Sequence, residues 1–279
     1  MLRRSVLTGA AATGLLALPA IRSARADTLE NVKKKGDLAV GTEAAYVPYE
    51  FFKDGKIVGY DIDIADHITP KINVKANFID TAWNGIIPAL YAGKFDCIIS
   101  GMTMTKERAE KVLFTQPYAD ASLMVLLRAD ESRITTAADL SGKTIGVQLG
   151  SAAAAKIKDF ENDKLKAAGK PGFTEIKQYE HYPEAYQDLL NKRTDAVINS
   201  RSTLLVLMHD TPGKFKMISG VSDVAAYYGM AFRKEDQALR DFFDDGLTEM
   251  KKDGSLAKLQ EKWFGSTMET PNKVPDVLL

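Results

Sequence analysis

The chain has 279 residues, with 37 Lys and Arg against 37 Asp and Glu, which is long enough for two modest domains or one large one. It holds a single cysteine, Cys97, so an intrachain disulfide is excluded, and its three scattered histidines offer no metal-ligand spacing. Because Cys97 lies inside the apolar run 95–99, we interpret it as a small buried side chain. The absence of any basic excess argues against a nucleic-acid partner.

The first 26 residues have the organisation of a leader. Arg3 and Arg4 precede an apolar run from 6 to 21, which is shorter than the roughly 20 residues of a membrane-spanning helix, and Ala24-Arg25-Ala26 matches a cleavage site. We expect a signal peptide cleaved after Ala26 and a periplasmic mature protein. Paired arginines favour the twin-arginine route, although they also occur in ordinary secretory leaders. Cleavage removes four arginines and no acids, leaving 33 basic against 37 acidic residues.

Beyond the leader, short β-like runs alternate with segments of helical periodicity. Trp83 to Leu90 places its apolar residues on one side, and Leu239 to Met250 repeats apolar residues at i, i+3, i+4, i+7, i+8 and i+11. The β-like runs are 37–41, 74–79, 95–99, 144–148, 173–179 and 196–199. Strand and helix in alternation predict an α/β fold with mainly parallel sheets.

Sheets of this kind bind ligands beyond the carboxyl ends of their strands, so the strand-to-helix junctions are the candidate sites. Three junctions hold unusual residues, namely 41–49, 100–108 and 148–151. In the third, Gly150 and Ser151 open an alanine-rich helix whose free backbone amides would form an anion site.

Arg108 stands out in the second junction. Thr105 is a candidate N-cap, which would place Arg108 in the first turn of a helix, where the macrodipole disfavours a cation. An anionic ligand shared by Arg108 and free helix amides would remove the conflict. The alternative is an exposed ion pair with Glu107 or Glu110.

The order and spacing of seven stretches together resemble the periplasmic polar-amino-acid binding proteins of ABC uptake systems, over nearly the whole mature chain. The stretches are 40–51, 59–65, 83–96, 100–118, 140–148, 192–199 and 262–265. The resemblance implies an α/β, two-lobed periplasmic binding protein fold (type II), with two crossing hinge strands and the ligand in the interlobe cleft.

Laid on this sequence, the resemblance divides the mature chain into two lobes. Lobe one would comprise 37–120 plus 224–265, and lobe two 121–223, with crossings near 118–123 and 219–226. Residues 266–279 would form a C-terminal tail of unknown purpose.

The resemblance also assigns residue roles. Arg108 matches the arginine that binds the ligand α-carboxylate, for which a bidentate guanidinium is suited. Tyr46 and Trp83 match the aromatic positions that sandwich the ligand side chain, although both types are also common as ordinary core residues. The other ligand contacts that the resemblance implies at these junctions are Gly101, Thr103, Gln148, Ser151 and Ala152.

One position departs from the family pattern. Where the family usually supplies an aspartate for the ligand's α-ammonium, this chain has Ser200, followed by Arg201. Glu43, Asn199 or Ser200 could bind the ammonium instead. Alternatively, Arg201 enters the cleft and the ligand carries a second acid group, as in an opine or a dicarboxylic compound; otherwise Arg201 is a solvated residue at a helix start.

We therefore expect the solute-binding component of an ABC uptake transporter, which closes around an amino acid or amino-acid-like carboxylate and delivers it to a permease at the inner membrane. We expect a monomer with no cofactor, no metal and no catalytic residue. The main alternative is a cyclohexadienyl (prephenate or arogenate) dehydratase-like enzyme on the same fold, with Glu43 as general acid. A receptor sensor domain is disfavoured because no transmembrane segment follows Trp263-Phe264-Gly265.

Overall fold

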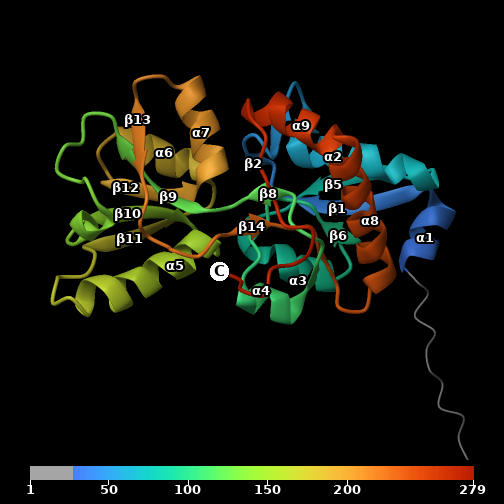
Figure 1. Cartoon of the computed structure of the whole chain (residues 1–279), viewed down its shortest axis with the longest axis horizontal. Coiled ribbons are helices and arrows are strands. Elements are labelled where there is room, and N and C mark those ends of the chain that lie inside the picture. The colour runs from blue at the N-terminus through green and yellow to red at the C-terminus, as the bar shows by residue number, and fades with distance from the viewer. Residues whose placement is uncertain (1–27) are drawn as a thin grey trace, which may run out of the picture.

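The computed structural model describes residues 28–279, so the predicted leader and its cleavage site lie outside the described residues. Figure 1 shows two lobes side by side, each built around its own twisted sheet. The sheet of lobe one has the strand order β5-β1-β6-β15-β7, and that of lobe two has the order β11-β10-β12-β9-β13. The predicted α/β, two-lobed fold is confirmed.

Lobe one combines parallel and antiparallel strands. Its strands are β1 (Asp37–Thr42), β5 (Lys75–Asp80), β6 (Cys97–Ile98), β7 (Leu113–Phe114) and β15 (Ala231–Phe232). A separate small sheet holds β2 (Ala45–Tyr46), β3 (Glu50–Lys53) and β4 (Lys56–Val58). The helices are α1 (Thr28–Lys35), α2 (Tyr60–Ile68), η1 (Thr69–Ile72), η2 (Trp83–Gly85), α3 (Ile86–Tyr91), α4 (Lys106–Lys111), α8 (Gln237–Asp253) and α9 (Ser255–Phe264).

Lobe two repeats this plan. Its strands are β9 (Leu123–Arg128), β10 (Thr144–Gln148), β11 (Glu175–Tyr179), β12 (Ala196–Ser200) and β13 (Phe215–Ile218). Its helices are η3 (Ala137–Leu140), α5 (Ala152–Phe160), the π-helical η4 (Glu161–Lys166), α6 (Tyr182–Leu190) and α7 (Arg201–Asp210). Helices lie on both faces of the sheet (Figure 1), and all five residues of β12 are buried, as expected for a central strand.

The prediction of mainly parallel sheets holds for one half of each sheet. β1 runs parallel to β5 and β6, and β10 runs parallel to β11 and β12. The strands that flank the crossings run the other way: β9 is antiparallel to β12 and β13, and β15 to β6 and β7. Both sheets are therefore mixed. The first antiparallel strand of each follows a crossing: β9 comes after the chain enters lobe two, and β15 comes after it returns to lobe one.

The crossing itself is a two-stranded ribbon. β8 (Ala119–Asp120) pairs antiparallel with β14 (Tyr227–Tyr228), with Tyr228 opposite Ala119. β14 begins one residue beyond the predicted range 219–226. Paired backbone, rather than a loose linker, thus joins the lobes, which favours rotation about a defined axis.

Core packing follows the sequence periodicity. Leu239, Phe243, Leu247 and Met250 form the buried face of α8, and Gly246 lets that face approach α2, since a Cβ there would lie 2.8 Å from the Ile68 side chain.

Cys97 is fully buried, as predicted. Within residues 28–279, no helix is long and apolar enough to cross a bilayer.

Candidate functional site

The predicted site residues meet between the lobes. An inner cavity of about 30 Å³ is lined from lobe one by the loops after β1 and β6, and from lobe two by the ends of β10 and β12. All predicted contacts except Ser200 line it: Glu43, Tyr46, Trp83, Gly101, Thr103, Arg108, Gln148, Ser151, Ala152 and Asn199. Around this inner cavity the two walls are in contact, through Arg108 with Gly150 and Tyr46 with Asn199.

Arg108 joins the lobes. Thr105 caps α4 by accepting a hydrogen bond from the Arg108 N–H at 3.2 Å, as predicted. The Arg108 guanidinium donates to the Thr103 carbonyl at 2.9 Å in lobe one and to the Gly150 carbonyl at 3.1 Å in lobe two. Burial lowers the pKa of Arg108 to about 10, which still leaves it cationic at neutral pH.

Within residues 28–279, Arg108 makes no ion pair with Glu107 or Glu110, the alternative role that the sequence allowed. Glu107 instead pairs with Lys111 at 2.6 Å on the same short helix. The guanidinium carbon of Arg108 lies 4.9 Å from the centre of the Trp83 ring, a cation–π contact, and the Trp83 indole N–H also donates to the Gly150 carbonyl at 3.2 Å. The contacts with Thr103, Gly150 and Trp83 therefore fix the position of the Arg108 guanidinium within the cleft.

The start of α5 supplies lobe two's share of this end of the cleft. Ser151 is the N-cap and its hydroxyl accepts from the Ala154 N–H at 3.0 Å. First-turn N–H groups have no acceptor within the helix, so those of Ala152 and Ala153, both at the inner cavity, provide partial positive charge there. Arg108 and this helix start therefore bring positive charge from both lobes to the same end of the cleft.

Tyr46 crosses to the other end of the cleft. Its hydroxyl lies 2.8 Å from Asn199 Oδ1, 3.2 Å from Ser200 Oγ and 2.7 Å from the Tyr228 hydroxyl, all buried. Tyr46 lies so close to Gly101 that a Cβ there would be 3.0 Å from its ring, and Gly101 has a φ of +40°. A glycine is thus required at Gly101 for this placement.

Ser200 lies behind the cavity wall, within this hydroxyl cluster. It is 1% exposed, and its hydroxyl donates to Thr203 Oγ1 at 3.0 Å. Arg201, by contrast, is exposed at the start of α7 and is not among the residues that line the cleft cavities. The hypothesis that Arg201 enters the cleft to bind a second acid group is therefore wrong for this arrangement of the lobes.

Glu43 makes an ion pair across the lobes. Its carboxylate lies 2.5 Å from His181 Nδ1, at the start of α6 in lobe two. Burial raises the pKa of Glu43 and the His181 contact opposes that rise. Burial acts to lower the pKa of His181, but the hydrogen bond and charge of Glu43 outweigh it, so the net shift is upward.

Two buried carboxyl groups support the loop that carries Gly101. The Ser100 hydroxyl donates to Glu50 at 2.7 Å, and the Gly101 N–H donates to Asp61 at 2.8 Å. Burial, and then the charge of Asp61, raise the pKa of Glu50 well above its usual range, and burial raises that of Asp61 to about 6. At neutral pH Glu50 and Asp61 together therefore favour holding one proton. The two groups then support the loop that carries Gly101 with one negative charge rather than two.

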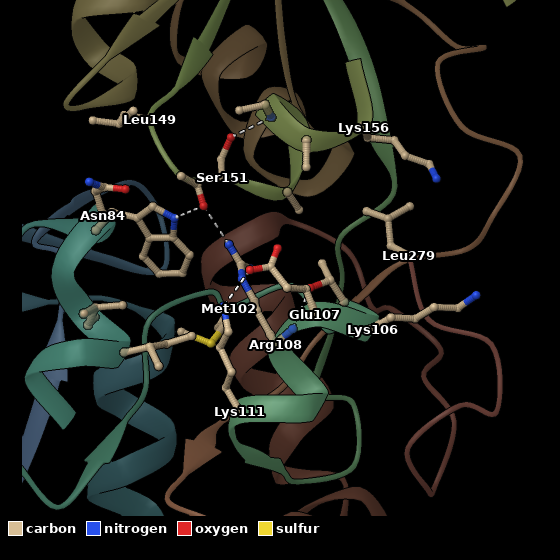
Figure 2. Close-up of a pocket in the computed structure, with 18 of the residues that line it drawn as sticks. Asn84, Met102, Lys106, Glu107, Arg108, Lys111, Leu149, Ser151, Lys156 and Leu279 are labelled. Atoms are coloured by element: carbon tan, nitrogen blue, oxygen red, sulfur yellow. Dashed lines mark hydrogen bonds and ion pairs between the residues drawn. The ribbon is translucent and has the colours of Figure 1, made fainter. Parts of the chain in front are cut away.

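An outer cavity of about 880 Å³ opens from the inner one, sharing Trp83, Arg108, Ser151 and Ala152 with it. Figure 2 shows Arg108 reaching up toward Ser151, with Asn84 on one side and Leu279 on the other. Lobe one contributes α3 and α4, lobe two contributes α5, and Leu279 comes from the last segment of the chain. This cavity is the mouth of the cleft.

Sequence reasoning missed several wall residues. Tyr182 lines the inner cavity and His181 pairs with Glu43; both lie within three residues of the end of β11, so the same strand-end rule that identified Gln148 could have found them. Tyr228 lies in the crossing strand and Glu50 in a short hairpin. Neither has a local signal, since the pairing of β8 with β14 positions Tyr228, and the contact with Ser100 after β6 positions Glu50.

The comparisons with known proteins agree on one family. The model for bacterial extracellular solute-binding proteins, family 3, matches residues 38–266. The L-cystine-binding protein TcyJ of Escherichia coli (strain K12) is 32% identical over 268 residues, covering 95% of this chain and 97% of that protein.

Two solved structures are similar throughout. An ancestral arginine-binding protein bound to arginine shares 38% identity with a TM-score of 0.74, covering 82% of this chain and 99% of that one. An ancestral amino acid-binding protein, AncCDT-1, described as a precursor of cyclohexadienyl dehydratase, shares 35% identity with a TM-score of 0.76, covering 85% and 99%. The chain belongs to the bacterial extracellular solute-binding proteins of family 3.

Proposed function

We propose that this protein is the periplasmic solute-binding component of an ABC uptake transporter and binds an amino acid or amino-acid-like carboxylate by lobe closure. The observation that carries the proposal is the meeting of Arg108 from lobe one with the start of α5 from lobe two at Gly150. An anionic group bound there touches both lobes, so its binding favours the closed form. The lobes are proposed to be 37–120 plus 224–265, and 121–223.

The carboxylate end is proposed to use Arg108, Thr103 and the α5 amides. A planar carboxylate takes two parallel hydrogen bonds from a guanidinium, which requires Arg108 to exchange its bonds to the Thr103 and Gly150 carbonyls for bonds to the ligand. Trp83 would then cover the ligand side chain on the outer side, next to the mouth.

The opposite end is proposed to bind the ammonium without the usual aspartate. Of the two carboxyl groups that line the cavity, Glu43 is the candidate because the raised pKa of Glu50 favours its neutral form, and Asn199 and Tyr46 supply neutral acceptors. Since Glu43 is already paired with His181, an ammonium must share that carboxylate. We infer that the site accepts both α-amino acids and acids that lack the ammonium, with less preference between them than an aspartate would give.

The cycle follows from the small volume of the inner cavity. A space of about 30 Å³ cannot admit an amino acid, so the lobes must separate about the β8–β14 ribbon for entry and close again around the ligand. The partner permease at the inner membrane would recognise the closed form. We also propose that the protein is a monomer and that it is exported with cleavage of its leader after Ala26.

We propose that the chain is not an enzyme, although the similarity to a precursor of cyclohexadienyl dehydratase makes that activity worth testing. A dehydratase needs a general acid beside the departing hydroxyl, and the raised pKa of Glu43, caused by burial, makes it the candidate. Incubation with prephenate should give no aromatic product by absorbance. Product formation that Glu43→Gln abolishes would contradict the transport proposal.

The main test is a thermal-shift screen of residues 27–279 against arginine, cystine, histidine, other amino acids, opines, dicarboxylates and aromatic acids. A ligand at a hundredfold excess over its Kd should stabilise the fold by about 2.7 kcal/mol. A shift with an α-amino acid supports ammonium binding by Glu43 and its neighbours. A shift only with acids lacking the ammonium would mean that Ser200 has changed the ligand class, and no shift with any carboxylate would contradict the proposal.

A further inference from the structure

The segment after α9 lies along lobe one. The Met268 N–H donates to Gln260 Oε1 at 2.8 Å, Thr270 Oγ1 donates to the Pro117 carbonyl at 3.1 Å, and Lys251 donates to the Pro271 carbonyl at 2.7 Å. Residues 266–279 contain no helix or strand, so these contacts fix the path of an extended segment. In Figure 1 it passes in front of the crossing strands toward the gap between α4 and α5.

The end of this segment touches both lobes. Val274 and Leu278 pack on the apolar cluster of lobe one that contains Trp83 and Ile86. Leu279 packs on the cluster of lobe two, which includes Ala153 and Ile157 of α5. Leu279 also packs on the main apolar cluster, which includes Leu38 of lobe one and Leu126 of lobe two, so this residue bridges the two lobes.

Leu279 also contacts the element that carries Arg108. Its carbonyl accepts the N–H of Lys106 at 3.3 Å, and Lys106 is the first residue of α4, whose N–H has no acceptor within the helix. The Leu279 side chain forms part of the wall of the outer cavity, and Figure 2 shows it between Lys106 below and Lys156 above. It thus lies at the mouth of the cleft, at the seam between the lobes.

We propose that residues 274–279 form a clasp that stabilises the closed arrangement of the lobes, with Leu279 as the residue that bears on lobe two. The inference rests on the proposed function, because it concerns the same opening and closing. When the lobes separate, a segment anchored on lobe one must withdraw Leu279 from α5 and expose apolar surface to water, which costs free energy. The clasp also forms the outer wall beside the ligand.

The chain offers matched variants. Leu279→Ala removes the contact with lobe two, Leu278→Ala loosens the anchor on lobe one, and Val277→Ala truncates a neighbouring side chain that is 62% exposed. Spin labels at Lys94→Cys and Lys164→Cys, both exposed and in different lobes, report the interlobe distance in the full chain. Cys97 is fully buried and should not take up label.

Distance distributions would be recorded without ligand and with the screened amino acid that gives the largest thermal shift. We expect the closed-to-open ratio to fall roughly five- to tenfold in Leu279→Ala and similarly in Leu278→Ala, and to stay within about twofold in Val277→Ala. Equal distributions in wild type and Leu279→Ala, with a populated closed form, would overturn the clasp while leaving the proposed function intact. A wild type that is open in every condition would contradict both.

Discussion

The two lobes contribute unlike chemistry to the cleft. Lobe one presents charged and aromatic side chains, led by Arg108, Glu43 and Trp83, on loops after its strands. Lobe two presents backbone amides at the start of α5 and the neutral side chains of Gln148, Tyr182 and Asn199. A ligand could make strong contacts with lobe one alone, whereas the contacts with lobe two become available only on closure.

This asymmetry has a physical consequence for specificity. A guanidinium selects for a carboxylate through charge, which acts before and after closure, but helix amides act only over short distances. At Ser200, where the resemblance predicts an aspartate, lobe two carries no charge. Variants that remove charge from lobe one, or restore it to lobe two, should therefore separate the two contributions.

The largest effect is expected for Arg108→Ala. It removes the cation from lobe one and leaves the carboxylate with neutral donors only, which should cost on the order of 2 to 5 kcal/mol of binding, measured by calorimetry with the ligand found in the screen. Arg201→Ala is the control, because it removes the same charge from an exposed site outside the cavities. Unchanged binding in Arg108→Ala would show that the carboxylate lies elsewhere.

Restoring the charge of lobe two should have the next largest effect. Ser200→Asp places a carboxylate beside the Tyr46 hydroxyl and should favour α-amino acids over their analogues without the ammonium by about 1.5 to 3 kcal/mol. The comparison is made by calorimetry on both ligands of a pair, with Ser200→Asn as the neutral control of similar size. The same preference in both variants would mean that charge at this position does not face the ammonium.

Trp83→Leu should weaken binding by about 1 to 2 kcal/mol, since it removes the cation–π contact that holds Arg108 and the indole hydrogen bond to Gly150. Trp263→Leu is a suitable control: its indole N–H donates to Asp63 in lobe one, and it does not line either cavity. Binding to Trp263→Leu should match wild type. The Trp263→Leu variant also keeps Trp83 as the one remaining tryptophan of the chain, so that its fluorescence can be used to titrate the ligand.

The smallest effect is expected for the interlobe pair. Because the pKa of His181 is raised in the folded protein, its contribution to stability is present below the unfolded value of about 6.5 and is lost as pH rises through the folded value. The raised pKa of Glu43 acts in the same direction at lower pH. The Tm of wild type should therefore fall more between pH 6 and pH 8 than that of His181→Gln, and parallel curves would contradict a role for this pair.

Much of the fold could be predicted from the sequence, because its signals are local. Thr144 to Gln148 is a strand with the predicted bounds, and the apolar repeat from Leu239 to Met250 lies within α8. The 95–99 run is shorter than expected: only Cys97–Ile98 form a strand, since β1 pairs with those two residues before the chain turns at Ser100 and Gly101. Antiparallel strands escaped prediction because strand direction depends on where the chain re-enters a sheet.

By itself the sequence determined the helix cap at Thr105 and the strand-end loops that hold Arg108 and Ser151, since each depends on neighbours a few residues away. Only the tertiary structure decided which groups meet. It joined Glu43 to His181, 138 residues apart, and directed Arg201 away from the cleft. It also brought Leu279 to the seam beside α4. Contacts of this kind come from closing two lobes around a hinge, and no local pattern in the chain encodes that geometry.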